Sequence, residues 1–131
     1  INRQPGSGTR VLFSKLLKEE AVEETSIHQP YPPEHTHAAV AAFVASGMAD
    51  AGFGVRAAAA RFGLDFIPLE IETYFVASRV ADRKGVGIQS LLRLMNSPTF
   101  KKQVADLPGY SSVLTGLSYS HWLELENQAT P

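Results

Sequence analysis

The residues best suited to chemistry lie near the start of the chain, in the stretch Asn2-Arg3-Gln4-Pro5-Gly6-Ser7-Gly8-Thr9-Arg10. The two glycines allow backbone angles that other residues avoid, and they let a ligand approach the main chain. Ser7 or Thr9 can cap a following helix, whose free N–H groups favour an anion. Arg3 and Arg10 flank the turn and could add charge-assisted hydrogen bonds. The pattern predicts an oxyanion site; the alternative is a glycine turn that only starts a helix.

Two better-known phosphate-binding loops do not fit these positions. A Walker loop ends in Gly-Lys-Ser/Thr, whereas Gly8 is followed by Thr9 and Arg10. The dinucleotide-binding fingerprint needs a third small residue where this chain has Val11. Nucleotide hydrolysis and Rossmann-type redox chemistry are therefore not predicted.

Composition narrows the class of protein. The 131 residues are 44% hydrophobic, which suits a single globular core. With 12 basic and 13 acidic residues the net charge is -1, so neither direct nucleic-acid contact nor a membrane surface is predicted. The absence of cysteine fits a reducing cytoplasm, and the longest apolar run, residues 38–45, is too short to cross a bilayer. Because Ile1 reads as part of a strand end, we expect a piece of a longer polypeptide.

Apolar periodicity predicts several helices. The first carries Leu12, Phe13, Leu16 and Leu17 on one face and is expected over about residues 7–22. Three prolines between residues 28 and 33 predict a loop. Further helices are expected over about residues 35–46 and 55–62, on the apolar face that includes Ile88 and Met95, and from Ser97-Pro98 onward. The residues after Trp122 are polar and are expected to be frayed.

Three short segments read as strands. Asp50–Gly54 and Asp65–Leu69 flank the helix over 55–62, which suggests a parallel crossover, and Thr73–Ala77 is β-branched and aromatic. The fold class predicted is α/β, with a mainly parallel sheet flanked by helices.

Several stretches, in this order, resemble the type II periplasmic-binding-protein-like domain, which is related to molybdate and tungstate receptors. That domain occurs attached to helix-turn-helix DNA-binding regions and to molybdopterin-biosynthesis enzymes. The matching stretches are residues 2–10, Thr36-His37-Ala38-Ala39-Val40-Ala41, Ala45-Ser46-Gly47-Met48-Ala49-Asp50-Ala51-Gly52-Phe53-Gly54, Gly63-Leu64-Asp65-Phe66-Ile67-Pro68-Leu69, Leu107-Pro108-Gly109-Tyr110 and Thr115-Gly116.

The resemblance implies a two-lobed α/β fold with a ligand in the cleft between the lobes. It implies that residues 1–131 are one domain fragment, with the second lobe over about 1–70 and a return segment with C-terminal helices over about 71–131. Most of the first lobe would then be absent, and a homodimer would be one way to cover the exposed apolar surface.

The resemblance also suggests ligand-binding residues. The Arg-x-x-x-Ser-Gly-Thr pattern of the tungstate-receptor relatives corresponds in type to Arg3, Ser7, Gly8 and Thr9, with Arg10 following. Thr36 would present a hydroxyl and helix N–H groups to the same cleft, with an ordinary N-cap as the alternative. Arg56 could reach the cleft or lie exposed on a helix.

Neither a metal site nor a catalytic site is predicted. His35 and His37 flank Thr36, but no cysteine or carboxylate cluster accompanies them, and a histidine that hydrogen-bonds a ligand fits better. Gly6-Ser7-Gly8 is too tight for the Gly-x-Ser-x-Gly elbow of a nucleophilic serine. No enzyme activity or cofactor is therefore expected.

The sequence thus predicts a non-enzymatic module that binds a small oxyanion, with molybdate or tungstate as the first choice. It would act as the sensor or delivery part of a larger protein, foremost a transcription regulator, in which lobe closure shifts an attached domain. One alternative is an accessory substrate-binding domain of a molybdopterin-biosynthesis enzyme. Another is a sensor of a small organic carboxylate.

Overall fold

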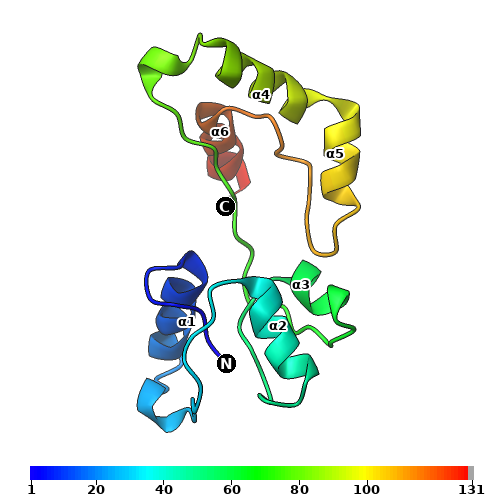
Figure 1. Ribbon diagram of the computed structural model, residues 1–131. Coiled ribbons are helices and arrows are strands. Elements are labelled where there is room, and N and C mark those ends of the chain that lie inside the picture. Colours follow the sequence, from blue (N-terminus) through cyan, green and yellow to red (C-terminus); the bar gives the residue numbers. More distant parts are fainter. Residues whose placement is uncertain (130–131) are drawn as a thin grey trace. The chain divides into compact units, whose positions relative to one another are not determined.

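The computed structural model of the protein describes the backbone of residues 1–129 and the side chains of residues 1–125. It divides into two units, Ile1–Pro68 and Leu69–Pro131. The first unit carries α1 (Gly8–Glu19), a 3₁₀ turn (Glu24–Ser26), α2 (His37–Ala45) and α3 (Arg56–Arg61) (Figure 1). The second carries a 3₁₀ turn (Val80–Asp82), α4 (Val86–Asn96), α5 (Pro98–Ala105) and α6 (Tyr119–Ala129). None of the described helices is long and apolar enough to cross a membrane.

The predicted α/β fold with a mainly parallel sheet is wrong. Within residues 1–129 the only β pairing is an isolated parallel bridge between Arg3 and Glu34. Residues 50–54, 65–69 and 73–77 are not strands, and residues 65–78 make no backbone–backbone hydrogen bond. Their side chains suit a strand, but a strand also needs a neighbour to pair its N–H and C=O groups. The described part of the chain supplies no such neighbour.

The predicted helices are confirmed, because their signals are local. Ser7 caps α1, Thr36 caps α2, and Ser97 caps α5 with Pro98 in its first turn. A frayed end was expected after Trp122, but α6 continues to Ala129, and the last two residues of that prediction, 130–131, lie outside the described residues. At the start of α6 the Ser118 hydroxyl accepts a hydrogen bond from the His121 amide (3.3 Å).

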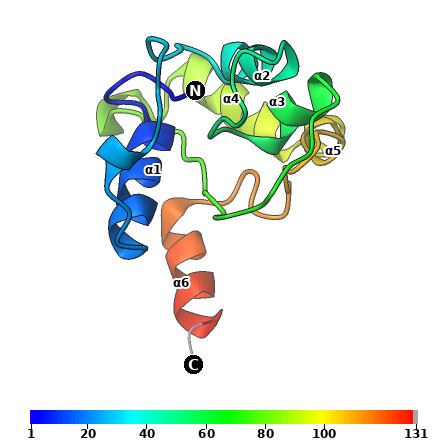
Figure 2. The ribbon, with the colours of Figure 1, turned by 90° about the horizontal axis from the view of Figure 1, so that it is seen from below.

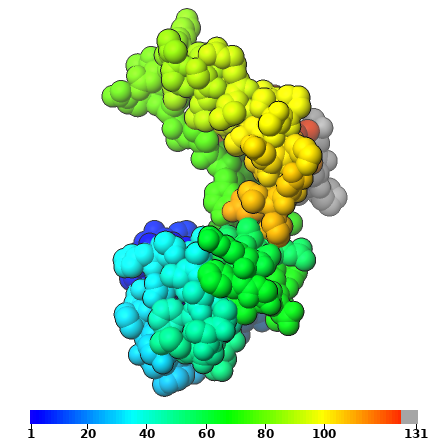
Figure 3. All heavy atoms as spheres, turned by 45° about the vertical axis from the view of Figure 1, so that its right-hand side comes forward, coloured from blue at the N-terminus to red at the C-terminus, as the bar shows by residue number. Residues whose placement is uncertain are grey.

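In the first unit, the opening residues run between α1 and α2 (Figures 1 and 2). Val40 and Ala41 of α2 are its buried hydrophobic residues, while Phe13 and Phe53 pack with ring centroids 5.4 Å apart. The alanines of α2 allow close packing, and α3 adjoins it on one face (Figure 3). This small core fixes the direction in which the helices of this unit begin.

The second unit has no fully buried side chain among those described. Its contacts are mainly aromatic: Phe75 packs edge-on against Trp122 of α6 at 5.0 Å, and Tyr74 stacks on Tyr110 at 6.4 Å. Ile71, on the extended segment before them, is 92% exposed. This unit therefore leaves much of its apolar surface uncovered.

The close approach of Gly52 to α2 gives a stability prediction. A Cβ at Gly52 would lie 2.5 Å from Cγ1 of the buried Val40 and 3.2 Å from Cγ2 of Ile1. Gly52→Ala should lower the free energy of unfolding by about 1–3 kcal/mol, measured by urea denaturation, because the core must shift. Gly8→Ala, where the added carbon meets open space, is the matched control. Equal unfolding curves for the two variants would contradict this packing.

Candidate functional site

The starts of α1 and α2 are brought together by the parallel bridge between Arg3 and Glu34. The Gln4 amide donates to the Glu34 carbonyl (3.0 Å), and the Glu34 amide donates to the Asn2 carbonyl (2.8 Å). Because the two segments run in the same direction, the helices that follow them begin at the same end of the unit, as Figure 1 shows.

The turn before α1 is held by its own hydrogen bonds. Gly6 has φ +83°, a left-handed conformation that favours glycine. The Ser7 hydroxyl donates to the Gln4 carbonyl (3.0 Å) and accepts from the Arg10 amide (3.2 Å). Within the described residues, the amides of Gly8 and Thr9 have no hydrogen-bond acceptor. Ser7 therefore orients the turn, and the next two amides are the groups left to bind a ligand.

Thr9 and Arg10 direct their side chains elsewhere. Thr9 is buried, with 9% of the residue exposed. The Arg10 guanidinium forms an ion pair with Glu24 and lies 5.7 Å from the ring centroid of Phe13. An anion contact from Arg10 would require it to leave Glu24.

At α2 the same arrangement is repeated. The Thr36 hydroxyl accepts from the Ala39 amide (3.0 Å), which is the N-cap role given as the alternative for this residue. The amides of His37 and Ala38 have no acceptor among the described residues. Two pairs of unbonded amides thus begin helices at one end of the unit.

Arg3 links the two helix starts through its side chain. Its Nε donates to Oε1 of Gln4 (3.1 Å), and one terminal nitrogen donates to the carbonyl of His35 (3.0 Å). The side chain is half-buried, and the other terminal nitrogen has no bond to the described residues. A guanidinium held in this way can offer its remaining N–H groups to an anion without further ordering.

Arg56 is the first residue of α3 and is exposed. The extended segment before it ends beside α2, because a Cβ placed on Gly54 would lie 3.5 Å from Nδ1 of His37. Among the described residues, the Arg56 side chain forms no hydrogen bond with Arg3, so its part in the site stays a prediction.

The sequence indicates His35 or His37 as a hydrogen-bonding partner of a ligand, and only the structure distinguishes the two. Burial, and then the positive charge of Arg3, lowers the pKa of the His37 imidazole below the ordinary value. Its Nδ1 is enclosed and has no hydrogen-bond partner in the described structure. The sequence showed a histidine beside Thr36, but only the fold brings it next to Arg3. Among the described residues, no group of three or more His, Cys, Asp or Glu could hold a metal ion.

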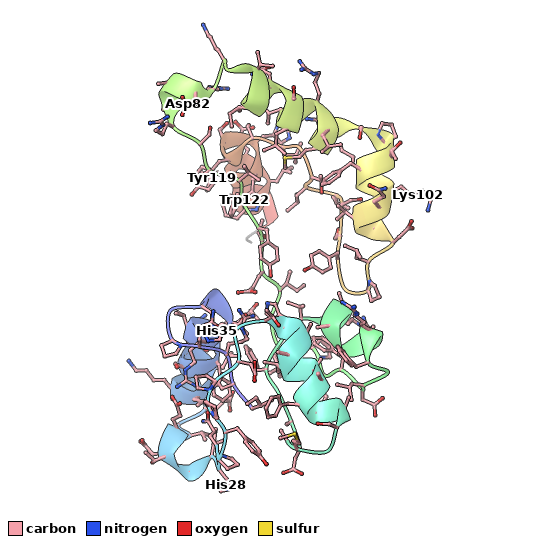
Figure 4. All side chains as sticks on the ribbon, in the orientation of Figure 1. His28, His35, Asp82, Lys102, Tyr119 and Trp122 are labelled. Atoms are coloured by element: carbon pink, nitrogen blue, oxygen red, sulfur yellow. The ribbon has the colours of Figure 1, made fainter. Side chains whose placement is uncertain are left out.

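A hollow of about 330 Å³ lies at the other end of the first unit. Ile27, His28, Tyr31, Met48 and Asp50 are among its lining residues, and none of the predicted site residues is. In Figure 4, His28 and His35 mark these opposite ends. This hollow is lined by apolar residues together with the polar side chains of His28, Gln29, Tyr31 and Asp50.

Comparison with known proteins identifies the family. The PBP superfamily domain matches residues 1–96. The chain belongs to this family. Members of the PBP superfamily are generally non-enzymatic, and the domain marks this chain as a ligand-binding module.

Two relatives extend the comparison. "Uncharacterized protein YvgK" of Bacillus subtilis (strain 168) is 35% identical over 116 residues, which cover 88% of this chain and 37% of the relative. "Uncharacterized protein in ferredoxin 2Fe-2S gene 5'region" of Clostridium pasteurianum is 34% identical over 82 residues, covering 62% of this chain and 73% of the relative. The chain thus spans little more than a third of the first relative's length. No solved structure matches the chain.

The proximity of Arg3 and His37 predicts a measurable coupling. Arg3→Gln should raise the pKa of His37, because one of the two causes of its lowering disappears; the pKa should stay below its ordinary value, because burial remains. Arg3→Lys, which keeps the charge, should leave the pKa low. NMR titration of the imidazole signals measures both. An unchanged pKa in Arg3→Gln would contradict the proximity.

The same lowering gives the sign of a pH effect on stability. Because the fold favours the neutral ring, the contribution of His37 is fully present above the unfolded pKa of about 6.5 and is lost as pH falls below it. His37→Gln should therefore flatten the loss of unfolding free energy between about pH 7 and 5, measured by urea denaturation. If His37→Gln loses as much unfolding free energy at low pH as the unmodified protein, groups other than His37 cause that loss.

Proposed function

We propose that the chain binds a small dianionic oxyanion at the starts of α1 and α2. The observation that supports this most is the pair of unbonded amides at each helix start, at Gly8 and Thr9 and at His37 and Ala38, joined by the Arg3 side chain. Backbone amides at helix N-termini are well suited to tetrahedral oxyanions, because the helix dipole favours negative charge there. Ser7 and Thr36 orient the two turns through their caps.

The combined charge of the two helix starts and the Arg3 side chain favours a dianion over a monoanion. Each helix start contributes the equivalent of roughly +0.5 charge, and Arg3 contributes a full charge, so the sum is about +2. Glu34 is an acidic residue close to Arg3 in the bridge. Its hydrogen bonds in the bridge are made by its backbone and not by its carboxylate. A monocarboxylate would leave part of this positive potential unbalanced.

Within the class of dianions, we propose molybdate or tungstate as the ligand. Gly6 and Gly8 leave the main chain open on the side of the turn, since a Cβ at either position would meet nothing within 4 Å. That open space admits an anion larger than sulfate. Membership in a family of ligand-binding domains supports a binding module. We propose that this module has a sensing or delivery role within a larger protein. A transcription regulator is the first such protein that we propose.

Isothermal titration tests the proposal. Molybdate, tungstate, sulfate, phosphate and succinate are titrated into the protein and into Arg3→Ala. We expect tight binding of the two larger oxyanions, and a loss of about 10- to 100-fold in affinity in Arg3→Ala, because a charge-assisted hydrogen bond contributes about 1.5–3 kcal/mol.

Arg61→Ala is the matched control, because it removes the same charge from the exposed end of α3. Its affinity should equal that of the unmodified protein. Circular dichroism verifies that both variants are folded. Failure of all four oxyanions to bind would contradict the proposal, and binding of succinate alone would favour an organic carboxylate.

A further inference from the structure

Residues 69–77 of the second unit have the composition of a strand but no strand partner among the described residues. All nine are exposed, and the segment contains no helix, turn or bend (Figure 1). Within the described part of the chain its backbone makes no hydrogen bond to other backbone groups, and the Ile71 amide donates to the Glu70 carboxylate (3.1 Å). A row of free N–H and C=O groups on such a segment is a template for pairing with another chain.

The apolar side chains of this segment are open to solvent. Ile71 is 92% exposed and Leu69 is 61% exposed. Phe75 packs edge-on against Trp122 and is still 53% exposed. Contiguous exposed apolar surface of this kind is typical of an interface with another protein chain.

The surface area of the chain also exceeds that of compact proteins. Its accessible surface is 9875 Å². By the scaling of surface with mass, even two separate compact bodies of half the 14.2 kDa mass would together expose only about 8,200 Å². The excess of about 1,700 Å² lies within the roughly 1,000–2,500 Å² that each partner buries in obligate homodimers. A second copy of the chain is therefore large enough to account for the uncovered surface.

The segment is complementary to itself in one antiparallel register. With the two-fold axis at Thr73, Ile71 lies opposite the partner's Phe75, and Glu72 lies opposite the partner's Tyr74. Pairs of a β-branched and an aromatic side chain stabilise neighbouring strands, whereas like charges in direct opposition destabilise them. Moving the register by two residues places either Glu72 opposite Glu72 or Phe75 opposite Thr73. The register centred on Thr73 avoids both and keeps the two Glu72 carboxylates on a diagonal.

We infer that the chain forms a homodimer in which residues 69–77 of the two copies pair as antiparallel strands. The pairing gives partners to the N–H and C=O groups along one edge of each segment, and it brings Leu69 and Ile71 beside apolar side chains of the second copy. The partner is a second copy because the segment complements its own sequence. The dimer does not depend on the oxyanion site, since that site lies in the first unit and residues 69–77 lie in the second.

Cysteine cross-linking tests the register, because the chain has no cysteine of its own. Thr73→Cys places two thiols at directly opposite positions, with Cα atoms about 4.5–5.5 Å apart, which a disulfide can span. We expect oxidation to convert this variant into a covalent dimer at micromolar concentrations. Ala77→Cys is the matched control, since its two thiols would lie more than about 20 Å apart along the strands and should stay mostly unlinked. Equal cross-linking of the two variants would overturn the pairing.

Sedimentation velocity tests the dimer itself. The unmodified protein should sediment with twice the 14.2 kDa mass of one chain. Ile71→Lys should weaken the dimer by at least about tenfold, because the side chain takes part in two cross-strand pairs of the dimer. Val80→Lys is the matched control, because Val80 is 90% exposed but lies outside the paired residues, and it should leave the dimer intact. Circular dichroism verifies that both variants are folded.

Two sedimentation results would overturn the inference: a monomeric unmodified protein, or a dimer that Ile71→Lys does not weaken. Amide hydrogen exchange adds a readout for the segment itself, since residues 69–77 should exchange slowly in the dimer and rapidly in monomeric Ile71→Lys. Slow exchange of these amides in a monomeric sample would place another part of the same chain against them and would also contradict the dimer.

Discussion

Two backbone hydrogen bonds between residues 2–4 and Glu34 are the constraint on which the site depends. They align two segments that are distant in sequence and run in the same direction, and each segment leads within a few residues into a helix. The two helices, each with unbonded amides in its first turn, therefore start from the same end of the unit. Without this bridge, α1 and α2 would each have an ordinary helix start, and neither would have sufficient positive potential to hold a dianion.

Most polar side chains near the two helix starts stabilise the structure and are not free to bind a ligand. Ser7 and Thr36 use their hydroxyls as caps, and Arg10 is committed to Glu24, so three of the most polar groups in the motif stabilise structure. What remains outward is mainly backbone, together with Arg3. Backbone donors are fixed in direction by the helix and need little reorganisation when a ligand arrives. A site of this kind depends on the position of the helices more than on any single side chain.

The sequence predicted what is determined locally and missed what is not. The α1, α2 and α5 boundaries followed from Ser7, Thr36 and Ser97, because a cap acts on amides only two or three residues away. Residues 50–54 and 65–69 were predicted as strands because their side chains suit a strand. Strand pairing also needs a neighbouring segment, which no local pattern specifies. The commitment of Arg10 to Glu24 and the closeness of His37 to Arg3 likewise arise from contacts over 14 and 34 positions. The sequence predicted the turn as an anion-binding motif, and the structure shows which of its amides are left without acceptors.

The most direct test of a shared site at the two helix starts is an amide NMR titration of the protein with tungstate. The predicted result is that the amide signals of Gly8 and Thr9 and those of His37 and Ala38 shift together, with a single apparent affinity. Shifts at only one helix start would contradict a shared site. Shifts confined to the hollow around Tyr31 and Met48 would place the ligand at the opposite end of the unit and contradict the assignment altogether.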